Sequence, residues 1–222
     1  MSTAALPPTE ENLIASYERM AHTYERPAVD RVLRTMDVAL SGVALVVLSP
    51  VIGLTALAVF AAGGRPVLYR GQRVGRAGRV FTMYKFRTLR PDAEERLGPF
   101  LGQQLTQLTA GEVSRLGRVL RATKLDELPQ LWNVLRGEMS IVGPRPIRPL
   151  FFEDLAQEIP TYWQRLVVRP GLTGIAQIYA DRDIPRHQKF RYDLLYIYNW
   201  SPWLDLKIML QTVVTVCRRT GQ

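Results

Sequence analysis

The uncharged stretch VALSGVALVVLSPVIGLTALAVFAA, residues 38–62, decides the fold class of this chain. A membrane segment needs about 20 apolar residues, so this length favours a membrane segment over the buried core helix of a soluble domain. Pro50, which follows Ser49, interrupts the stretch at its centre and leaves 12 residues on either side, 38–49 and 51–62. At about 1.5 Å per residue each half reaches only about 18 Å, well short of a hydrocarbon thickness of about 30 Å.

Two geometries fit this proline-broken stretch: a kinked helix that crosses the bilayer, and a broken helix that enters and leaves on the same face. Pro50 removes a backbone donor and frees a carbonyl near Val46. The Ser49 hydroxyl can bond a carbonyl one turn back, which lowers the cost of a bend in lipid. Basic residues at both ends favour the re-entrant geometry with both ends cytoplasmic. These residues are Arg31, Arg34, Arg65 and Arg70.

The net charge of +9 over 222 residues is unevenly distributed. Residues 1–37 hold four arginines and six acids, so the remainder carries +11. Eight basic residues and no acid lie between Gly64 and Arg90. Such a block favours an anionic partner: a nucleic acid, an anionic lipid or a nucleotide-type substrate.

Length and composition predict one main domain with appendages. Residues 1–37 have no early apolar region, so no signal peptide is expected. Cys217 is alone, and His22 and His187 have no ligand spacing, so neither a disulfide framework nor a His/Cys metal site is expected.

Local patterns predict a mainly helical domain with a short β-hairpin. Residues 10–25 predict a surface helix, and residues 29–37 predict a helix along the membrane interface. Residues 66–68 and 80–86 predict strands around the turn GRAGR at 75–79. Further helices are predicted over residues 87–108, 109–120, 150–166, 190–198 and 203–216.

Two adjacent carboxylates, Asp126 and Glu127, lie near the start of KLDELPQLWNVLRGEMSIVGPRP, residues 124–146. The apolar residues that follow have the spacing of one helix face, which Gly137 would end. These residues are Leu128, Leu131, Trp132 and Leu135.

The carboxylate pair has two interpretations. In the first, Thr123 and Asp126 form a capping box at a helix N-terminus. In the second, the pair works in phosphoryl chemistry: one carboxylate attacks phosphorus, and the other helps to hold Mg²⁺ with substrate oxygens.

Basic residues supply the charge that phosphoryl chemistry needs, although each also has a plainer role. Lys85 and Arg87 alternate with aromatic residues in MYKFRTLRP, as on the solvated face of a strand. Arg145 is held between two prolines, which suits a fixed guanidinium that grips phosphate. Arg169 before Pro170-Gly171 is a similar but weaker candidate.

Four segments resemble, in order, the bacterial sugar transferases. These are the monotopic phosphoglycosyl transferases that begin glycan assembly on a polyprenol phosphate. The segments are KFRTL (85–89), LDELPQLWNVLRGEMSIVGPRP (125–146), RPGLTGIAQI (169–178) and YDLLYIYNWSPWLDLKIMLQT (192–212). The resemblance covers about residues 30–216 and includes Ser49-Pro50. Leu89 replaces a usual methionine, and Ala180-Asp181-Arg182 departs from a frequent Gly-Arg pair.

The resemblance implies a re-entrant helix and an α/β, mainly α, catalytic domain at the cytoplasmic face of the bacterial inner membrane. Asp126 would attack the sugar-linked phosphate of a UDP-sugar and release UMP. The phosphosugar would then pass to undecaprenyl phosphate and so initiate the assembly of a polysaccharide or glycoconjugate. Glu127 would help to hold Mg²⁺. The implied substrate-binding residues are Pro144, Arg145 and Pro146 at the nucleotide, with Lys85, Arg87 and Arg169 at phosphates.

The expected organisation is a polar leader (1–28), interfacial and re-entrant helices (29–63), a transferase domain (64–216) and a tail (217–222). Downstream glycosyltransferases are expected partners, and a homodimer is left open. No residue identifies the sugar. The rival functions are a membrane-tethered nucleic-acid binder, for which no base-stacking or helix-turn-helix pattern is present, and a non-catalytic scaffold.

Overall fold

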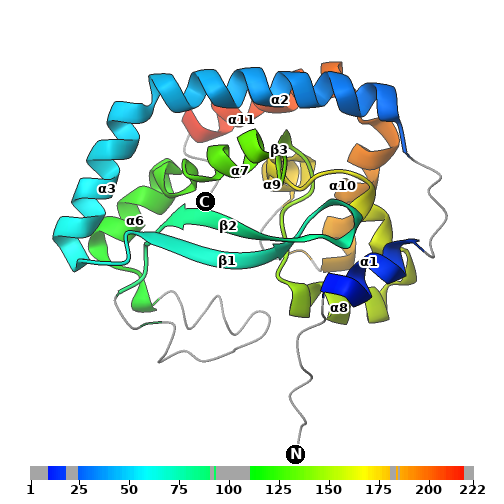
Figure 1. Cartoon of the computed structure of the whole chain (residues 1–222), viewed down its shortest axis with the longest axis horizontal. Coiled ribbons are helices and arrows are strands. Elements are labelled where there is room, and N and C mark those ends of the chain that lie inside the picture. The colour runs from blue at the N-terminus through cyan, green and yellow to red at the C-terminus, as the bar shows by residue number, and fades with distance from the viewer. Residues whose placement is uncertain are drawn as a thin grey trace, which may run out of the picture.

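The computed structural model describes residues 10–18, 25–90, 93, 111–180, 184 and 186–217 (Figure 1). The helix expected over residues 87–108 and the Asp181-Arg182 pair lie wholly or largely outside these residues. Within the described part, the chain is mainly helical and has two small two-stranded sheets. This confirms the mainly α class.

Two helices that meet at a sharp bend form the apolar segment. Helix α2 (Pro27–Val47) and helix α3 (Ser49–Gly63) meet at Leu48 with a bend of 62°, and they follow the top and left of Figure 1. The Ser49 hydroxyl donates to the Val46 carbonyl at 2.8 Å, the acceptor that Pro50 leaves without its helical N–H donor. The predicted break and its hydroxyl bond are confirmed. No single described helix is long and apolar enough to cross a membrane, whereas the bent pair passes that test together.

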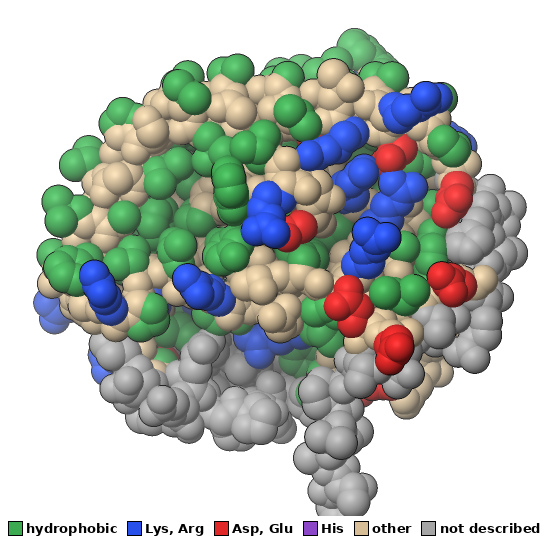
Figure 2. All heavy atoms as spheres, in the orientation of Figure 1, with side chains coloured by type: hydrophobic (Ala, Val, Ile, Leu, Met, Phe, Trp, Pro, Cys, Tyr) green, Lys and Arg blue, Asp and Glu red, His purple; other side chains and the backbone are tan. Residues whose placement is uncertain are grey.

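Large apolar side chains remain exposed along the outer surface of this bent pair (Figure 2). They include Val43, Val46, Val47, Leu54, Leu57 and Phe60. Helix α11 (Pro202–Cys217) adds exposed Trp203, Leu210 and Val213. Contiguous apolar surface of this kind marks a membrane or protein contact.

A β-hairpin follows the apolar pair in the chain and crosses the middle of Figure 1. Strand β1 (Leu68–Val74) pairs antiparallel with β2 (Val80–Phe86). The predicted bounds of β2 are confirmed, whereas the first strand begins at Leu68, where its predicted range ends. A short 3-10 turn, η1 (Arg76–Gly78), joins the strands.

Helix α1 (Glu10–Glu18) packs one face against this turn, while Glu10, Glu11 and Glu18 stay exposed. The predicted surface helix is therefore confirmed over residues 10–18, and residues 19–24 lie outside the described part of the chain. Leu13 and Tyr17 are buried in a core cluster with Phe152. Gly78 has φ +78°, and a Cβ there would lie 2.7 Å from the Leu13 backbone. Two apolar side chains one helical turn apart therefore bury one face of α1, against a turn that glycine keeps clear.

A second, parallel sheet pairs β3 (Ser140–Val142) with β4 (Gly171–Thr173), and it contacts α2, α7 and α11. Further helices are α6 (Arg115–Thr123), η2 (Leu125–Glu127), α7 (Gln130–Arg136), α8 (Pro149–Glu158), η3 (Pro160–Val167), α9 (Ile175–Tyr179) and α10 (Arg186–Asn199). The helices predicted over residues 109–120, 150–166, 190–198 and 203–216 correspond to α6, to α8 with η3, to α10 and to α11.

Helix α7 buries only part of the predicted face, because Leu131 is buried as expected but Trp132 is not. Trp132 is 50% exposed, whereas Asn133 and Val134 are fully buried. The Asn133 side chain accepts the Tyr84 N–H at 3.1 Å and donates to the Thr82 carbonyl at 2.7 Å. These bonds turn the polar residue inward because they satisfy backbone groups of β2. Gly137 ends the helix with φ +83°, as predicted.

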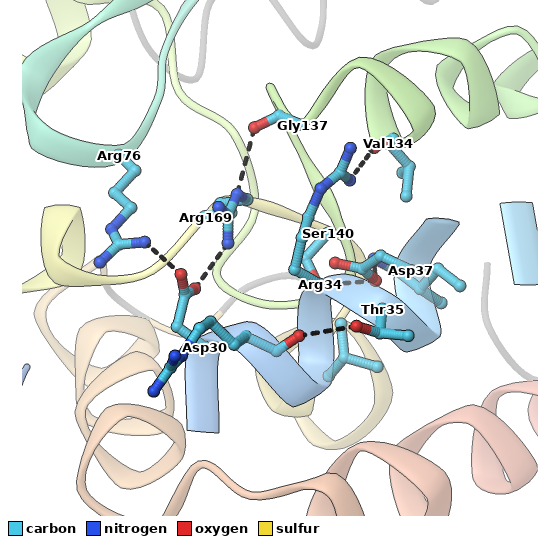
Figure 3. Close-up of polar contacts among 12 residues, drawn as sticks. Asp30, Arg34, Thr35, Asp37, Arg76, Val134, Gly137, Ser140 and Arg169 are labelled. Carbon is cyan, nitrogen blue, oxygen red and sulfur yellow. Dashed lines mark hydrogen bonds and ion pairs between the residues drawn. The ribbon is translucent and has the colours of Figure 1, made fainter. Parts of the chain in front are cut away.

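The start of α2 is tied to the domain by buried and partly buried polar contacts (Figure 3). The Asp30 carboxylate accepts from Arg76 at 2.7 Å and from Arg169 at 2.6 Å. Asp37 lies two turns further along the same face of the helix. It accepts from the Ser140 hydroxyl at 3.0 Å and from the Ile141 N–H at 2.9 Å. The acids in α2 therefore anchor the helix to the domain.

Arg34 supplies a further anchor at the C-terminal end of α7. Its guanidinium donates to the Val134 and Leu135 carbonyls at 2.6 and 2.7 Å (Figure 3). A cation is favoured at this end of a helix because the last carbonyls lack helical partners. Helix α2, which contains the first half of the apolar segment, therefore contacts α7, the helix that follows the carboxylate pair.

Candidate active site

The carboxylate pair lies on the 3-10 helix η2, between α6 and α7. Lys124 ends α6 in the left-handed conformation with φ 59° and turns the chain into η2. The Thr123 hydroxyl donates backward to the Val119 carbonyl at 2.8 Å. The capping-box interpretation of Thr123 and Asp126 is therefore wrong, because Thr123 ends one helix instead of beginning the next.

Lys85 and Glu127, 42 positions apart in the sequence, form an ion pair. The Lys85 Nζ lies 2.7 Å from the Glu127 Oε1, and the side chains are 18% and 17% exposed. Burial works to raise the pKa of Glu127, but the charges of Lys85 and Arg145 prevail and hold it below its usual range. Glu127 is therefore ionised at neutral pH. Burial also lowers the pKa of Lys85, while the charge of Glu127 opposes that effect.

Asp126 is the more buried carboxylate, with 7% of its surface exposed. Burial raises its pKa, the charge of Lys85 opposes this, and the charge of Glu127 raises it further. Arg121 on α6 also lowers this pKa, and its Nε donates to the Thr88 hydroxyl at 3.0 Å. A desolvated carboxylate beside cations can act as a nucleophile toward phosphorus.

The Pro144-Arg145-Pro146 segment places a further cation at this site. Arg145 is exposed, and its charge lowers the pKa values of both Lys85 and Glu127. Since the charge of Arg145 acts on both members of the Lys85–Glu127 pair, the structure brings these three predicted residues together.

Arg73 and Arg148 extend this positive region. Burial lowers the pKa of Arg73. The charges of Arg148 and Arg145 lower it further, whereas the charge and hydrogen bond of Tyr69 oppose this shift. Tyr69 hydrogen-bonds Arg73 and accepts from the Arg148 Nη2 at 3.3 Å. Arg73 lay within the basic block of residues 64–90 but was not singled out, and Arg148 follows Pro146 by two positions. The sequence signal for Arg73 was its place in the basic block, and the signal for Arg148 was its closeness to Pro146.

Arg87 and Arg169 have structural partners elsewhere. The Arg87 Nη2 donates to the Gly63 and Gly64 carbonyls at 2.7 and 3.1 Å, at the end of α3. Arg169 binds Asp30 and donates to the Gly137 carbonyl at 3.1 Å (Figure 3). Both arginines join the apolar pair to the domain, and their contact with substrate phosphate stays a prediction.

The carboxylates of Asp126 and Glu127 suit the simplest kind of Mg²⁺ site, in which the protein supplies only one or two ligands. Among the described residues, no group of three or more His, Cys, Asp or Glu side chains gathers to hold a metal. Mg²⁺ commonly uses one or two carboxylates and completes its shell with water and substrate phosphate oxygens. The ionised Glu127 beside Asp126 can supply such a partial shell.

Comparison with known proteins gives one consistent result. The bacterial sugar transferase family model matches residues 29–219. The chain is 41% identical over 194 residues to a UDP-glucose:undecaprenyl-phosphate glucose-1-phosphate transferase of Caulobacter vibrioides, covering 85% of this chain and 70% of that protein.

Two longer relatives have names that specify other sugars. A UDP-N-acetylgalactosamine-undecaprenyl-phosphate N-acetylgalactosaminephosphotransferase of Aeromonas hydrophila is 38% identical over 192 residues, 85% of this chain and 44% of that protein. An undecaprenyl-phosphate galactose phosphotransferase of Salmonella typhimurium is 34% identical over 227 residues, 96% of this chain and 47% of that protein. The chain thus spans about half the length of these two relatives. With the family model matched over residues 29–219, the chain belongs to the bacterial sugar transferase family.

Proposed function

We propose that this protein transfers a sugar-1-phosphate from a UDP-sugar to undecaprenyl phosphate and releases UMP. The observation that carries the proposal is the buried Asp126 beside the ionised Lys85–Glu127 pair, in a region that Arg73, Arg145 and Arg148 make positive. The names of the relatives support the donor and acceptor classes.

The reaction proceeds by two displacements at one phosphorus atom. A carboxylate oxygen of Asp126 bonds to the sugar-linked phosphorus, while the bond from that phosphorus to the bridging oxygen breaks and UMP leaves with the electron pair. An oxygen of undecaprenyl phosphate then bonds to the same phosphorus, and the Asp126 carboxylate leaves. The products are undecaprenyl-diphospho-sugar and a regenerated carboxylate.

The surrounding charges match what each displacement needs. Phosphoryl transfer depends on positioning and on neutralisation of the charge on the transferred group and the leaving group. The charge of Lys85 lowers the pKa of both carboxylates and so favours their ionised forms, and Arg145 presents an exposed guanidinium to the diphosphate. Glu127 would hold Mg²⁺, which supplies further charge neutralisation at the phosphate oxygens when bound.

A re-entrant placement of α2 and α3 supports this chemistry at a membrane. Arg34 and Asp37 fix the start of the pair to the domain, and Arg87 fixes its end. Because both ends contact one domain, the exposed apolar bend around Leu48 can enter one leaflet and return. We place the domain at the cytoplasmic face of the inner membrane, where the basic residues near both ends are favoured.

Measurements of UMP release test whether Asp126 is the nucleophile. Purified protein in lipid nanodiscs with Mg²⁺, undecaprenyl phosphate and a panel of UDP-sugars should release UMP with at least one donor. The Asp126→Asn variant should release none, whereas the matched Asp154→Asn variant, at an exposed acid on α8, should behave as the native chain. Mass spectrometry should find a phosphosugar adduct on the peptide with Asp126. Undiminished turnover in Asp126→Asn would overturn the mechanism.

Cysteine labelling tests the topology. In a Cys217→Ser background, the variants Glu11→Cys and Arg79→Cys place single thiols at exposed positions on α1 and on the hairpin turn. Both thiols should react with an impermeant reagent only when it reaches the cytoplasmic face. Labelling from opposite faces would show that the bent pair spans the membrane.

A further inference from the structure

A buried arginine lies beneath the Pro144-Arg145-Pro146 segment. Arg165 belongs to η3, and only 5% of its surface is exposed. Its guanidinium donates to the Arg145 carbonyl at 2.8 Å and to the Tyr162 hydroxyl at 2.7 Å. It also lies 3.1 Å from the Asp193 carboxylate of α10. One cation thus joins three segments that are distant in the sequence.

Asp193 explains why the guanidinium stays in place. Both side chains are buried, and a buried carboxylate is costly unless it is paired. Burial raises the pKa of Asp193 to about 6, although the charge of Arg165 opposes the shift. The carboxyl group is therefore mostly ionised at neutral pH. The guanidinium is held by the carboxylate on α10 and by its contact with the Tyr162 ring, whose centroid lies 4.9 Å away.

The Pro144-Arg145-Pro146 segment depends on such support because it has few backbone N–H donors. Pro144 and Pro146 have no N–H, so the segment can be held mainly through its carbonyl oxygens. The Gly171 N–H donates to the Pro144 carbonyl at 2.9 Å. Arg165 holds the next carbonyl, that of Arg145. These two bonds fix the backbone from which the exposed Arg145 side chain extends.

We propose that Arg165, held by Asp193, is a positioning residue that fixes the Arg145 backbone so that the Arg145 guanidinium meets the diphosphate of the donor. This inference rests on the proposed function. Arg165 acts only through Arg145, because it is buried and its contacts are with protein groups.

Kinetics test the coupling between the two arginines. Arg165→Lys keeps the charge but cannot reach all three partners with one planar group. It should raise KM for the UDP-sugar about tenfold, the ratio expected for about 1.4 kcal/mol of lost charge-assisted bonding, and should change kcat less. In an Arg145→Ala background, the same substitution should change KM less than about twofold. An undiminished effect in that background would overturn the inference.

Hydrogen exchange provides a readout that does not need turnover. In full-length protein in nanodiscs, the peptide that contains the Arg145 and Ile147 amides should exchange faster in Arg165→Lys and in Asp193→Asn. The exposed Arg79→Lys variant should leave it unchanged. Unchanged exchange in Asp193→Asn, with an unaltered melting temperature, would overturn the inference. If the native protein releases no UMP from any donor, the proposed function fails, and hydrogen exchange alone decides whether Arg165 fixes the segment.

Discussion

Replacing Lys85 by methionine removes the cation that faces both active-site carboxylates. The Lys85–Glu127 pair is 2.7 Å long, and its side chains are 18% and 17% exposed. Exposed pairs contribute up to about 1 kcal/mol, whereas breaking a fully buried pair costs about 3–5 kcal/mol. At this intermediate burial, we expect Lys85→Met to lower the free energy of unfolding by about 2 kcal/mol.

A double-mutant cycle separates the ion pair from the loss of packing. Glu127→Gln alone should also destabilise the protein, because Lys85 loses its partner. The double variant should be more stable than the sum of the single effects by about 1 kcal/mol, since no buried charge then lacks its partner. Denaturant unfolding in detergent, followed by tryptophan fluorescence, measures each term. Arg136→Met is the control, because its pair with Glu138 at 3.3 Å is half-exposed on the arginine side, and it should cost under about 1 kcal/mol.

The same variant should alter the pH dependence of turnover. Because Lys85 lowers the pKa of Asp126, its removal should raise that pKa. The nucleophile must be deprotonated, so the acidic limb of the pH–rate profile should move to higher pH in Lys85→Met. Strictly additive stability changes together with an unmoved acidic limb would refute the assignment of Lys85 as the charge that governs both carboxylates.

Three further predictions concern other parts of the molecule. Native turnover should fall as the pH is lowered through the pKa of Asp126, which burial raises above that of an ordinary aspartate, and a pH–rate profile measures this. Leu13→Ala should lower the stability by about 2–4 kcal/mol, measured by unfolding, because Leu13 is buried; an effect below about 0.5 kcal/mol would contradict the packing of α1. Burial raises the pKa of Asp205 to about 7, so the folded state binds this proton more tightly than the unfolded state. Native stability should therefore fall, relative to Asp205→Asn, by up to about 4 kcal/mol as the pH rises from about 4 to 8, and parallel unfolding curves across that range would contradict it. The Asn variant keeps an acceptor for Tyr196, which donates to Asp205 at 3.0 Å.

The sequence by itself determined the features that depend on neighbouring residues. The break in the apolar stretch follows from a missing proline N–H and a serine hydroxyl one turn from the freed carbonyl, and both appear in the structure at Ser49-Pro50. Strand β2 and the glycine that ends α7 were likewise predictable, because alternation and positive φ are local properties. The adjacent carboxylates and the ordered motifs also sufficed to indicate phosphoryl chemistry.

Only the tertiary structure decided which distant groups meet. It placed Lys85 beside Glu127, and it directed Arg87 and Arg169 to the ends of the apolar pair. It also buried Asn133 while Trp132 stayed half-exposed, because Asn133 satisfies backbone groups of β2 that a sequence pattern cannot reveal. The physical reason is common to all of these: charge and hydrogen-bonding capacity belong to a residue, but the partner that satisfies them is chosen by the path of the chain.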